Sequence, residues 1–183
     1  MIRTFVSLRI PDAVLDDIYG FIKKEAGNSF YSYRWTPKEN LHITIKFIGE
    51  IEEAKVEEIC EKLFYNKAEF DKLEMNFSEF GFFERNNVPS VFWISGTLNN
   101  IITGFAKHTE DILSEIGIPK EKRLFKPHLT LLRLKGSEDL RVLRQLKEHG
   151  IDKITYKPES IELIRSELSP GGSKYYVIKN LIK

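Results

Sequence analysis

The chain has 183 residues, of which 42% are hydrophobic and 30% are charged, and its formal net charge is +1. This length and composition fit one ordinary globular domain with a sizeable core, and they exclude a disordered or fibrous chain. A near-neutral charge argues against a protein that grips long duplex DNA through a global basic surface, but it leaves room for a local basic cleft that takes a short nucleic acid.

The first half of the chain shows alternating strand and helix patterns. The periodicity predicts a strand over 3–9, a helix over 12–26, a strand over 41–48, a helix over 52–65 and a β-like segment over 70–83. Asp12 is available as the N-cap of the first helix, and Gly27 as its stop. The strand over 41–48 has the strongest pattern, because every second residue from Leu41 to Phe47 is apolar and the residues between them are polar.

The second half of the chain repeats this order. It predicts a strand over 90–97, a helix over 100–116, a strand over 127–134, a helix over 138–149, a strand over 153–168 and a strand over 174–182. The spacing also repeats, since Phe5 precedes His42 by 37 residues and Phe92 precedes His128 by 36. Each half therefore reads strand, helix, histidine-bearing strand, helix, strand.

These matching halves predict an internal duplication of two lobes. The approximate halves are 1–85 and 88–183, and no linker rich in proline, glycine and serine divides them, so we expect one two-lobed domain over 1–183. The expected fold class is α+β, with two antiparallel sheets, flanking helices and a central cleft.

A tetrapeptide of the form His-apolar-Thr-apolar occurs once in each half. Its copies start at His42 and His128, and each lies on a predicted strand. Side chains two residues apart on a strand point to the same face, so Thr44 accompanies His42 and Thr130 accompanies His128. If the lobes are related by an approximate two-fold axis, the two polar pairs face each other across the cleft.

Two facing histidines suit the cleavage of a phosphodiester. The reaction needs a base that deprotonates the nucleophile and an acid that protonates the leaving oxygen, and histidine titrates close enough to neutral pH to do either. Threonine hydroxyls and a nearby guanidinium can stabilise the negative charge that develops on the phosphoryl oxygens. This chemistry needs no metal and no cofactor.

Other readings of the motif are weaker. A single His-x-Thr on a strand is more often an edge residue than a catalyst, but the two copies use two of only four histidines at equivalent points of the repeat. A metal site lacks carboxylates close to either histidine, and a serine nucleophile lacks a Gly-x-Ser-x-Gly elbow.

The cysteine content and the hydropathy of the chain indicate the cellular compartment in which we expect the protein. The single cysteine, Cys60, excludes an intrachain disulfide framework and a multi-cysteine metal site. The N-terminal apolar run is too short for a signal-peptide core, and no uninterrupted apolar stretch of ~18 residues occurs. We expect a soluble, cytoplasmic protein with no membrane partner.

The segments around the two histidines resemble the signatures of a known family. Residues 41–50 and 126–133 are similar to the two motifs of the RNA 2′,3′-cyclic phosphodiesterases, also called 2′-5′ RNA ligases, in the two-histidine (2H) phosphoesterase superfamily. The resemblance continues at Arg34-Trp35 and over 163–171, and so spans nearly the whole chain. It implies a bilobal α+β fold, hydrolysis of cyclic phosphates to 2′-phosphates, weak reversible ligation of RNA ends, and independence from metal.

The resemblance also implies roles for individual residues. His42 matches the proton donor to the departing 3′ oxygen, and His128 matches the base that activates water. Thr44 and Thr130 match phosphate-binding hydroxyls, and Arg133 matches the arginine that follows the second motif. Two departures are mild: isoleucine replaces a frequent leucine at position 45, and lysine stands at position 126, where arginine is common and would allow bidentate phosphate contact.

Arg133 raises a geometric difficulty. It lies five residues after His128, so a regular strand would point the two side chains to opposite faces. A bulge or the end of the strand can re-aim the arginine. The alternative is an ordinary surface arginine.

Five further residues are candidates for RNA contact. Phe5 and Trp35 can stack on a base, although aromatic residues beside a core strand usually belong to the core. Lys122, Arg123 and Lys126 form a basic stretch before His128, which can guide an RNA backbone or simply be solvated.

We therefore expect a monomeric enzyme that acts on RNA 2′,3′-cyclic phosphate ends. One alternative is a related enzyme for a small cyclic phosphate, such as an ADP-ribose cyclic phosphate. Another is a non-catalytic binder of RNA ends, which would not need both histidines and both threonines. The basic stretch before His128 favours RNA.

Overall fold

The computed structural model describes residues 1–170 and 172–183. Its strands are β1 (Ile2–Arg9), β2 (Ile43–Ile51), β3 (Met75–Arg85), β4 (Val88–Gly96), β5 (His128–Arg133), β6 (Ile154–Tyr156), β7 (Ser160–Ser169) and β8 (Gly172–Asn180). Its α-helices are α1 (Asp12–Ala26), α2 (Glu53–Lys62), α3 (Lys67–Phe70), α4 (Asn100–Glu115) and α5 (Arg141–His149). Gly171, which closes the segment 163–171 of the family resemblance, lies outside the described residues.

The strands form a sheet in the order β6-β3-β4-β5-β2-β1-β7-β8, and its neighbouring strands are antiparallel. One register pair, Ile43 with Leu129, joins β2 to β5 at the centre and divides the sheet into two four-stranded halves. This arrangement confirms the expected α+β class.

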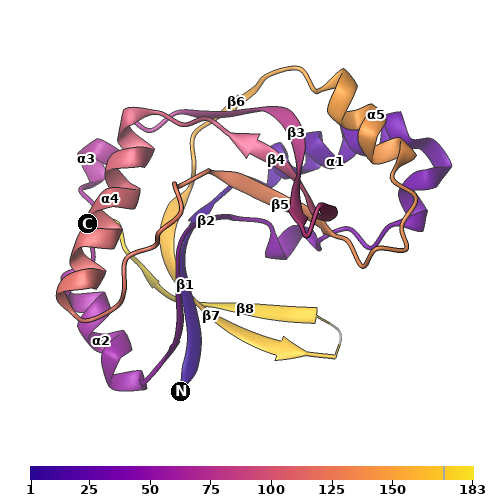
Figure 1. Cartoon of the computed structure of the whole chain (residues 1–183). Coiled ribbons are helices and arrows are strands. Elements are labelled where there is room, and N and C mark those ends of the chain that lie inside the picture. The colour runs from indigo at the N-terminus through magenta and orange to yellow at the C-terminus, as the bar shows by residue number, and fades with distance from the viewer. Residues whose placement is uncertain (171) are drawn as a thin grey trace.

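The two halves of the chain exchange elements across this centre. Strand β3 joins β4, β5 and β6, whereas β7 and β8 join β1 and β2. Helices α2, α3 and α4 lie beside β1 and β2, and α1 and α5 lie beside β3 and β4 (Figure 1). Individual contacts join residues from the two halves of the chain. Lys46 of β2 forms an ion pair with Glu110 of α4, and Phe21 of α1 stacks on Phe80 of β3.

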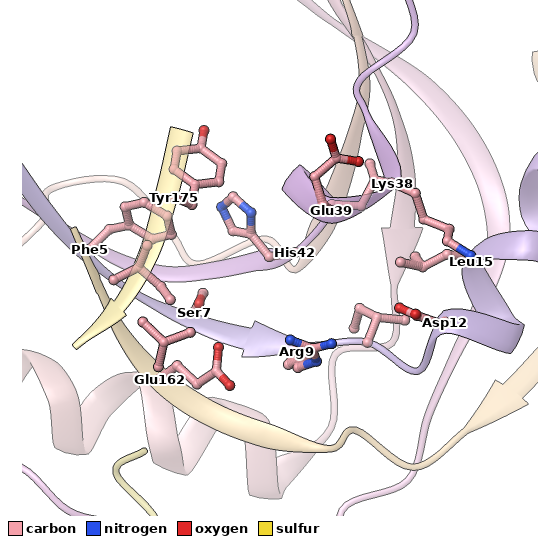
Figure 2. Close-up of a pocket in the computed structure, with 14 residues that line it drawn as sticks. Phe5, Ser7, Arg9, Asp12, Leu15, Lys38, Glu39, His42, Glu162 and Tyr175 are labelled. Carbon is pink, nitrogen blue, oxygen red and sulfur yellow. The ribbon is translucent and has the colours of Figure 1, made fainter. Parts of the chain in front are cut away.

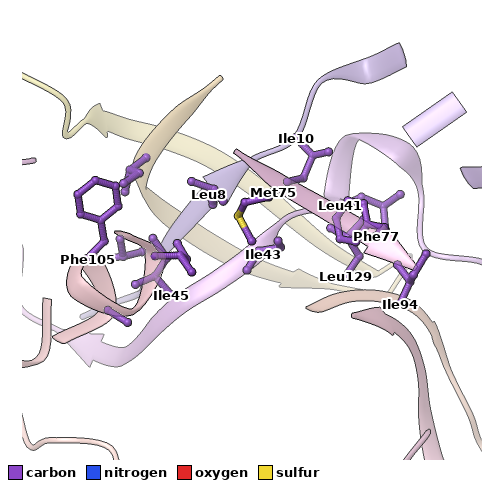
Figure 3. Packing of buried hydrophobic residues seen from close by; sticks show 14 of the residues in the cluster. Leu8, Ile10, Leu41, Ile43, Ile45, Met75, Phe77, Ile94, Phe105 and Leu129 are labelled. Atoms are coloured by element: carbon purple, nitrogen blue, oxygen red, sulfur yellow. The ribbon is translucent and has the colours of Figure 1, made fainter. Parts of the chain in front are cut away.

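A continuous hydrophobic core lies between the sheet and these helices. Ile43, Ile94 and Leu129 are fully buried in it, and Figure 3 shows them in the same cluster. Because the buried members of the two motifs point into this core, the residues beside them point to the opposite face of the sheet. In the described part of the chain, no helix is long and apolar enough to cross a membrane.

Helix α1 has the predicted bounds, Asp12–Ala26, but a different N-cap from the expected one. Pro11 is the N-cap, so the expected N-cap at Asp12 is wrong, and Asp12 is the first helical residue. Its negative charge still interacts favourably with the positive end of the helix dipole. The helix ends at Gly27, as expected, with a φ of +53° that favours glycine.

A β-bulge at Ile45 interrupts the alternation of apolar and polar side chains that was expected over 41–48. Ser7 faces Thr44 and Val6 faces Lys46, so Ile45 is an extra residue with no partner in β1. Because of this extra residue, the side chains after it point to the faces opposite to those expected. As a result, Lys46 is 6% exposed on the core side, whereas Phe47 is 60% exposed on the other side.

The long strand expected over 153–168 is two strands. Pro158 lies in the break between β6 and β7, and proline cannot donate a ladder hydrogen bond. Strand β6 pairs with β3, whereas β7 pairs with β1 in the other half of the sheet.

Candidate active site

The two histidine motifs lie at the centre of the sheet. His42 immediately precedes β2, and His128 is the first residue of β5. Around the antiparallel pair of Ile43 and Leu129, the chains run in opposite directions, which directs His42 towards Thr130 and Thr44 towards His128. We call the face of the sheet that carries these four polar residues the histidine face.

A backbone carbonyl fixes the orientation of the His42 ring. Its Nδ1 lies 2.8 Å from the carbonyl oxygen of Asn40, and because a carbonyl only accepts, Nδ1 carries the proton and donates it. Its Nε2 lies 3.1 Å from Oγ1 of Thr44. The ring stacks on Phe5 at 4.7 Å and meets the edge of Tyr175 at 5.2 Å. The basic nitrogen Nε2 therefore faces the threonine of the same motif.

His128 is held in the same way. Its Nδ1 lies 2.7 Å from the carbonyl oxygen of Lys126, again two residues earlier in the chain. Phe83 contacts the ring edge-on at 4.8 Å, and Trp93 lies 6.5 Å away. Both motifs thus use Nδ1 for a hydrogen bond to a backbone carbonyl, so the unprotonated nitrogen of each neutral ring is Nε2.

A bulge in β5 places Arg133 on the histidine face. Trp93 faces Thr130 and Phe92 faces Leu132, so Leu131 is the extra residue, and Arg133 then faces Val91. Val91 and Trp93 share one face of β4, so Arg133 shares the face of Thr130. The bulges in β2 and β5 both occur three residues after the histidine, which makes Phe47 the positional counterpart of Arg133.

The charges of this face act on both histidines. Burial lowers the pKa of His42 from its ordinary value of 6.5 to about 4, against the hydrogen bond to Asn40, and the charges of His128 and Arg133 also lower it. Burial lowers the pKa of His128 as well, against the hydrogen bond to Lys126 and with a smaller contribution from Arg133. Because Arg133 acts on both rings, the three groups share one electrostatic environment.

A cavity of about 290 Å³ lies beside His42. Its walls come from β1, the start of α1, β7, β8 and the residues before β2, and they include both aromatic and charged side chains. Figure 2 shows His42 beside Phe5 and Tyr175, with Glu162 and Arg9 further along the cavity.

A second cavity, of about 180 Å³, lies beside His128. It is mainly apolar, and its lining residues are Phe83, Trp93, Ser95, Gly96, Leu98, Phe125, Lys126, Pro127 and His128. Gly81 allows Trp93 to lie here, because a Cβ at Gly81 would come within 2.8 Å of Cε2 of the indole.

The five residues that were expected to contact RNA do not lie together in the structure. Phe5 is only 3% exposed and supports the ring of His42. Trp35 donates from Nε1 to the carbonyl of Phe30, stacks on Phe30, and lies outside the lining of both cavities described above. Lys122, Arg123 and Lys126 are exposed, and Lys126 also lines the cavity beside His128.

Sequence reasoning missed several residues that surround the histidines. Tyr175 reaches His42 from β8, far along the chain and outside either motif. Ser7 faces Thr44 across the β1–β2 pair, and Ser95 faces His128 across the β4–β5 pair. The two serines could have been found, because each lies near the start of one sequence half, on the strand before the histidine strand.

Known proteins are similar to this chain in sequence and in fold. The LigT-like phosphoesterase family matches residues 9–93 and 96–175. An RNA 2′,3′-cyclic phosphodiesterase of Methanocaldococcus jannaschii is 31% identical over 179 residues, which cover 97% of this chain and 98% of that protein. A protein of the same name from Thermotoga maritima is 27% identical over 176 residues, covering 96% and 92% of the two chains.

Two solved structures have a similar fold. The protein TT0787 of Thermus thermophilus superposes with a TM-score of 0.79 at 22% identity, covering 98% of this chain and 97% of that one. LigT of E. coli in complex with 3′-AMP superposes with a TM-score of 0.70 at 20% identity, covering 97% and 95% of the two chains.

Proposed function

Because this chain belongs to the LigT-like phosphoesterase family, we propose that it hydrolyses RNA 2′,3′-cyclic phosphate ends to 2′-phosphates. His42 and His128 act as the acid and the base, and no metal takes part. The observation that carries the proposal is the matched pair of imidazoles, each held through Nδ1 by a carbonyl two residues earlier and sharing one face with Arg133.

The base in this mechanism is His128. Its lowered pKa keeps the ring neutral at pH 7, so Nε2 can take a proton from water as the water oxygen attacks phosphorus. The bond from phosphorus to the 3′ oxygen then breaks, and His42 donates the proton that the departing oxygen needs. The 2′ oxygen keeps the phosphate.

The acid role of His42 requires that its pKa rise when substrate binds. A pKa of about 4 leaves the ring neutral in the free protein at pH 7. The negative charge of a phosphodiester bound beside Nε2 favours the imidazolium and raises this pKa. The binding of the anion and the protonation of His42 are therefore coupled.

The remaining polar groups stabilise the phosphoryl oxygens. The hydroxyls of Thr44 and Thr130 donate hydrogen bonds, and the guanidinium of Arg133 neutralises developing charge. The described residues form no group of three or more histidine, cysteine, aspartate or glutamate side chains that could hold a metal ion. In this proposal the enzyme is a monomer.

RNA is favoured over a small cyclic phosphate by the exposed Lys122, Arg123 and Lys126, which precede β5 and can contact a phosphate backbone. The curated relatives also carry the name RNA 2′,3′-cyclic phosphodiesterase. With a 5′-hydroxyl in place of water as the nucleophile, the same step would break the bond from phosphorus to the 3′ oxygen and give a 2′-5′ linkage.

The direct test incubates the protein with a short RNA that ends in a 2′,3′-cyclic phosphate, with EDTA present, and locates the phosphate in the product. The expected product is a 2′-phosphate. No turnover, turnover that requires added metal, or a 3′-phosphate product would contradict the proposal. Faster turnover of ADP-ribose cyclic phosphate than of RNA would favour a small-molecule enzyme.

A further inference from the structure

The cavity beside His42 carries two opposite charges on one face of the sheet. Arg9 of β1 and Glu162 of β7 both line it. Ser7 faces Glu162 and Arg9 faces Ser160 in the β1–β7 pair, so Arg9 and Glu162 are diagonal neighbours on the same face. The Cα atoms of such neighbours lie ~7–8 Å apart. The guanidinium and the carboxylate can therefore contact two groups of one ligand.

Both charged groups have hydrogen-bonding capacity left for a ligand. Arg9 donates from Nε to Glu159 at 2.8 Å, and its two terminal nitrogens have no hydrogen-bond partner among the described residues. The carboxylate of Glu162 accepts one hydrogen bond, from the hydroxyl of Ser160 at 2.7 Å, and a carboxylate can accept about four. Figure 2 shows Arg9 and Glu162 below His42 in the view.

The rest of the cavity suits a flat ring system. Its volume of about 290 Å³ is at the lower end of the range for small-molecule sites. Its apolar walls include the aromatic rings of Phe5 and Tyr175 and the aliphatic side chains of Ile10 and Ile164. A nucleobase has apolar faces and a polar edge, and it matches a cavity with these walls and two polar contacts.

Guanine has the polar edge that fits this pair of charges. Its O6 and N7 accept hydrogen bonds, which arginine donates in a bidentate contact. Its N1–H and its 2-amino group lie side by side and donate, which suits a carboxylate. Adenine presents an acceptor at N1 that a carboxylate would repel, and the pyrimidines offer no two adjacent donor groups.

We propose that this cavity binds the guanine base of a terminal guanosine and that Glu162 selects it. The inference rests on the proposed function, because His42 protonates the 3′ oxygen and also lines the cavity, so that the terminal ribose lies beside it. The enzyme then hydrolyses cyclic phosphate ends that carry guanosine in preference to ends that carry another nucleoside.

The test uses two RNAs that differ by one amino group. One ends in guanosine 2′,3′-cyclic phosphate and the other in inosine 2′,3′-cyclic phosphate, which keeps O6, N7 and N1–H but lacks the 2-amino group. Both are hydrolysed in one tube, and mass spectrometry of the products gives the ratio of their kcat/KM values. We expect a ratio of ~10 or more in favour of guanosine, the effect of one hydrogen bond to a charged group.

Three variants assign this ratio to its residue. Glu162→Leu removes both acceptor oxygens and should bring the ratio close to unity, whereas Glu162→Gln keeps one acceptor and should give an intermediate ratio. Glu167→Leu is the matched control, because it removes the same charge from the same strand outside the cavity lining, and it should keep the wild-type ratio. Because the two RNAs compete for the same enzyme, a loss of folded protein or of turnover cancels in the ratio.

Two outcomes would overturn the inference while leaving the hydrolase intact. One is a wild-type ratio near unity. The other is a wild-type preference that persists in both Glu162→Leu and Glu162→Gln, since another residue would then select the base. Failure of the proposed function is distinct, because neither RNA would then be hydrolysed.

Discussion

Ile43 of β2 pairs with Leu129 of β5, and this pair joins the two halves of the sheet. Each residue is the apolar neighbour of a histidine, and both are fully buried. Because one pair connects the halves, the relative placement of the two imidazoles depends on its packing.

Ile43→Ala should therefore lower the free energy of unfolding. Removing these buried carbons leaves a cavity, and we expect a loss of ~2–5 kcal/mol in denaturant unfolding. Leu168→Ala is the matched control, because Leu168 is 71% exposed on β7 and its truncation should cost less than ~0.5 kcal/mol. Similar losses for the two variants would show that the central pair does not anchor the sheet.

The central strands were predictable because two independent signals agreed there. Alternation fixed the strands around His42 and His128, and the repeated tetrapeptide fixed which residues share a face. The positions of Phe47 and Arg133 were not determined by local pattern. Each depends on a bulge, and the bulge is set by pairing with β1 or β4, whose registers skip Ile45 and Leu131.

Long-range pairing also explains the other differences. Tyr175 reaches His42 because β8 pairs with β7 and β7 pairs with β1, a relationship between distant segments that no short motif encodes. The break at Pro158 could have been predicted from the sequence, because proline interrupts the hydrogen bonds between strands. The pairing of β7 with β1 in the other half of the sheet could not.

Arg133→Ala should reduce turnover by ~10- to 150-fold, the equivalent of ~1.5–3 kcal/mol for hydrogen bonds to a charged phosphate. Arg133→Lys should retain part of the activity, because lysine keeps the charge without bidentate geometry. Arg144→Ala, an exposed arginine on α5, serves as the control.

The dependence of kcat/KM on pH gives a second test of the role of Arg133. Arg133 lowers the pKa of both histidines, so Arg133→Ala should move the limbs of the profile of kcat/KM towards higher pH. Normal turnover and an unshifted profile in this variant would place the guanidinium outside the reaction centre.

The burial of His42 makes stability depend on pH. Its pKa is about 4 in the folded protein against an ordinary value of 6.5, so below pH 6.5 the unfolded chain binds more protons than the folded one. The free energy of unfolding should therefore fall as the pH falls from 6.5 towards 4. His42→Gln removes this group, and denaturant unfolding across that range should show a shallower fall. Parallel curves for wild type and variant would contradict the lowered pKa.

Lys122 and Arg123 are expected to act on RNA rather than on the reaction. Their joint replacement by alanine should weaken RNA binding and flatten its dependence on salt, because two phosphate contacts are lost. A cyclic mononucleotide should be hydrolysed at nearly the wild-type rate. Lys23→Ala with Lys24→Ala removes the same charge from the exposed surface of α1 and controls for net charge. Equal losses on both substrates would instead assign the loop a role in the fold or the reaction centre.

The two histidines should behave as one unit. His42→Ala and His128→Ala should each lower kcat by ~10²-fold or more, with a much smaller change in KM, because acid and base act in the transition state. The double variant should be little worse than either single variant, since both groups serve the same step. The pH profile of the wild type should be bell-shaped, with both limbs set by imidazoles.

Substitution of Thr44 or Thr130 should have a different pattern of effects from substitution of the histidines. Thr44→Val and Thr130→Val each remove one hydrogen bond to a charged phosphate and should cost ~1.5–3 kcal/mol of transition-state stabilisation. Their effects should add to each other more nearly than those of the histidines, because each hydroxyl makes its own contact. If both histidine variants hydrolysed the cyclic phosphate at the wild-type rate while Thr44→Val and Thr130→Val weakened binding, the protein would be a binder of RNA ends and the acid–base assignment would be wrong.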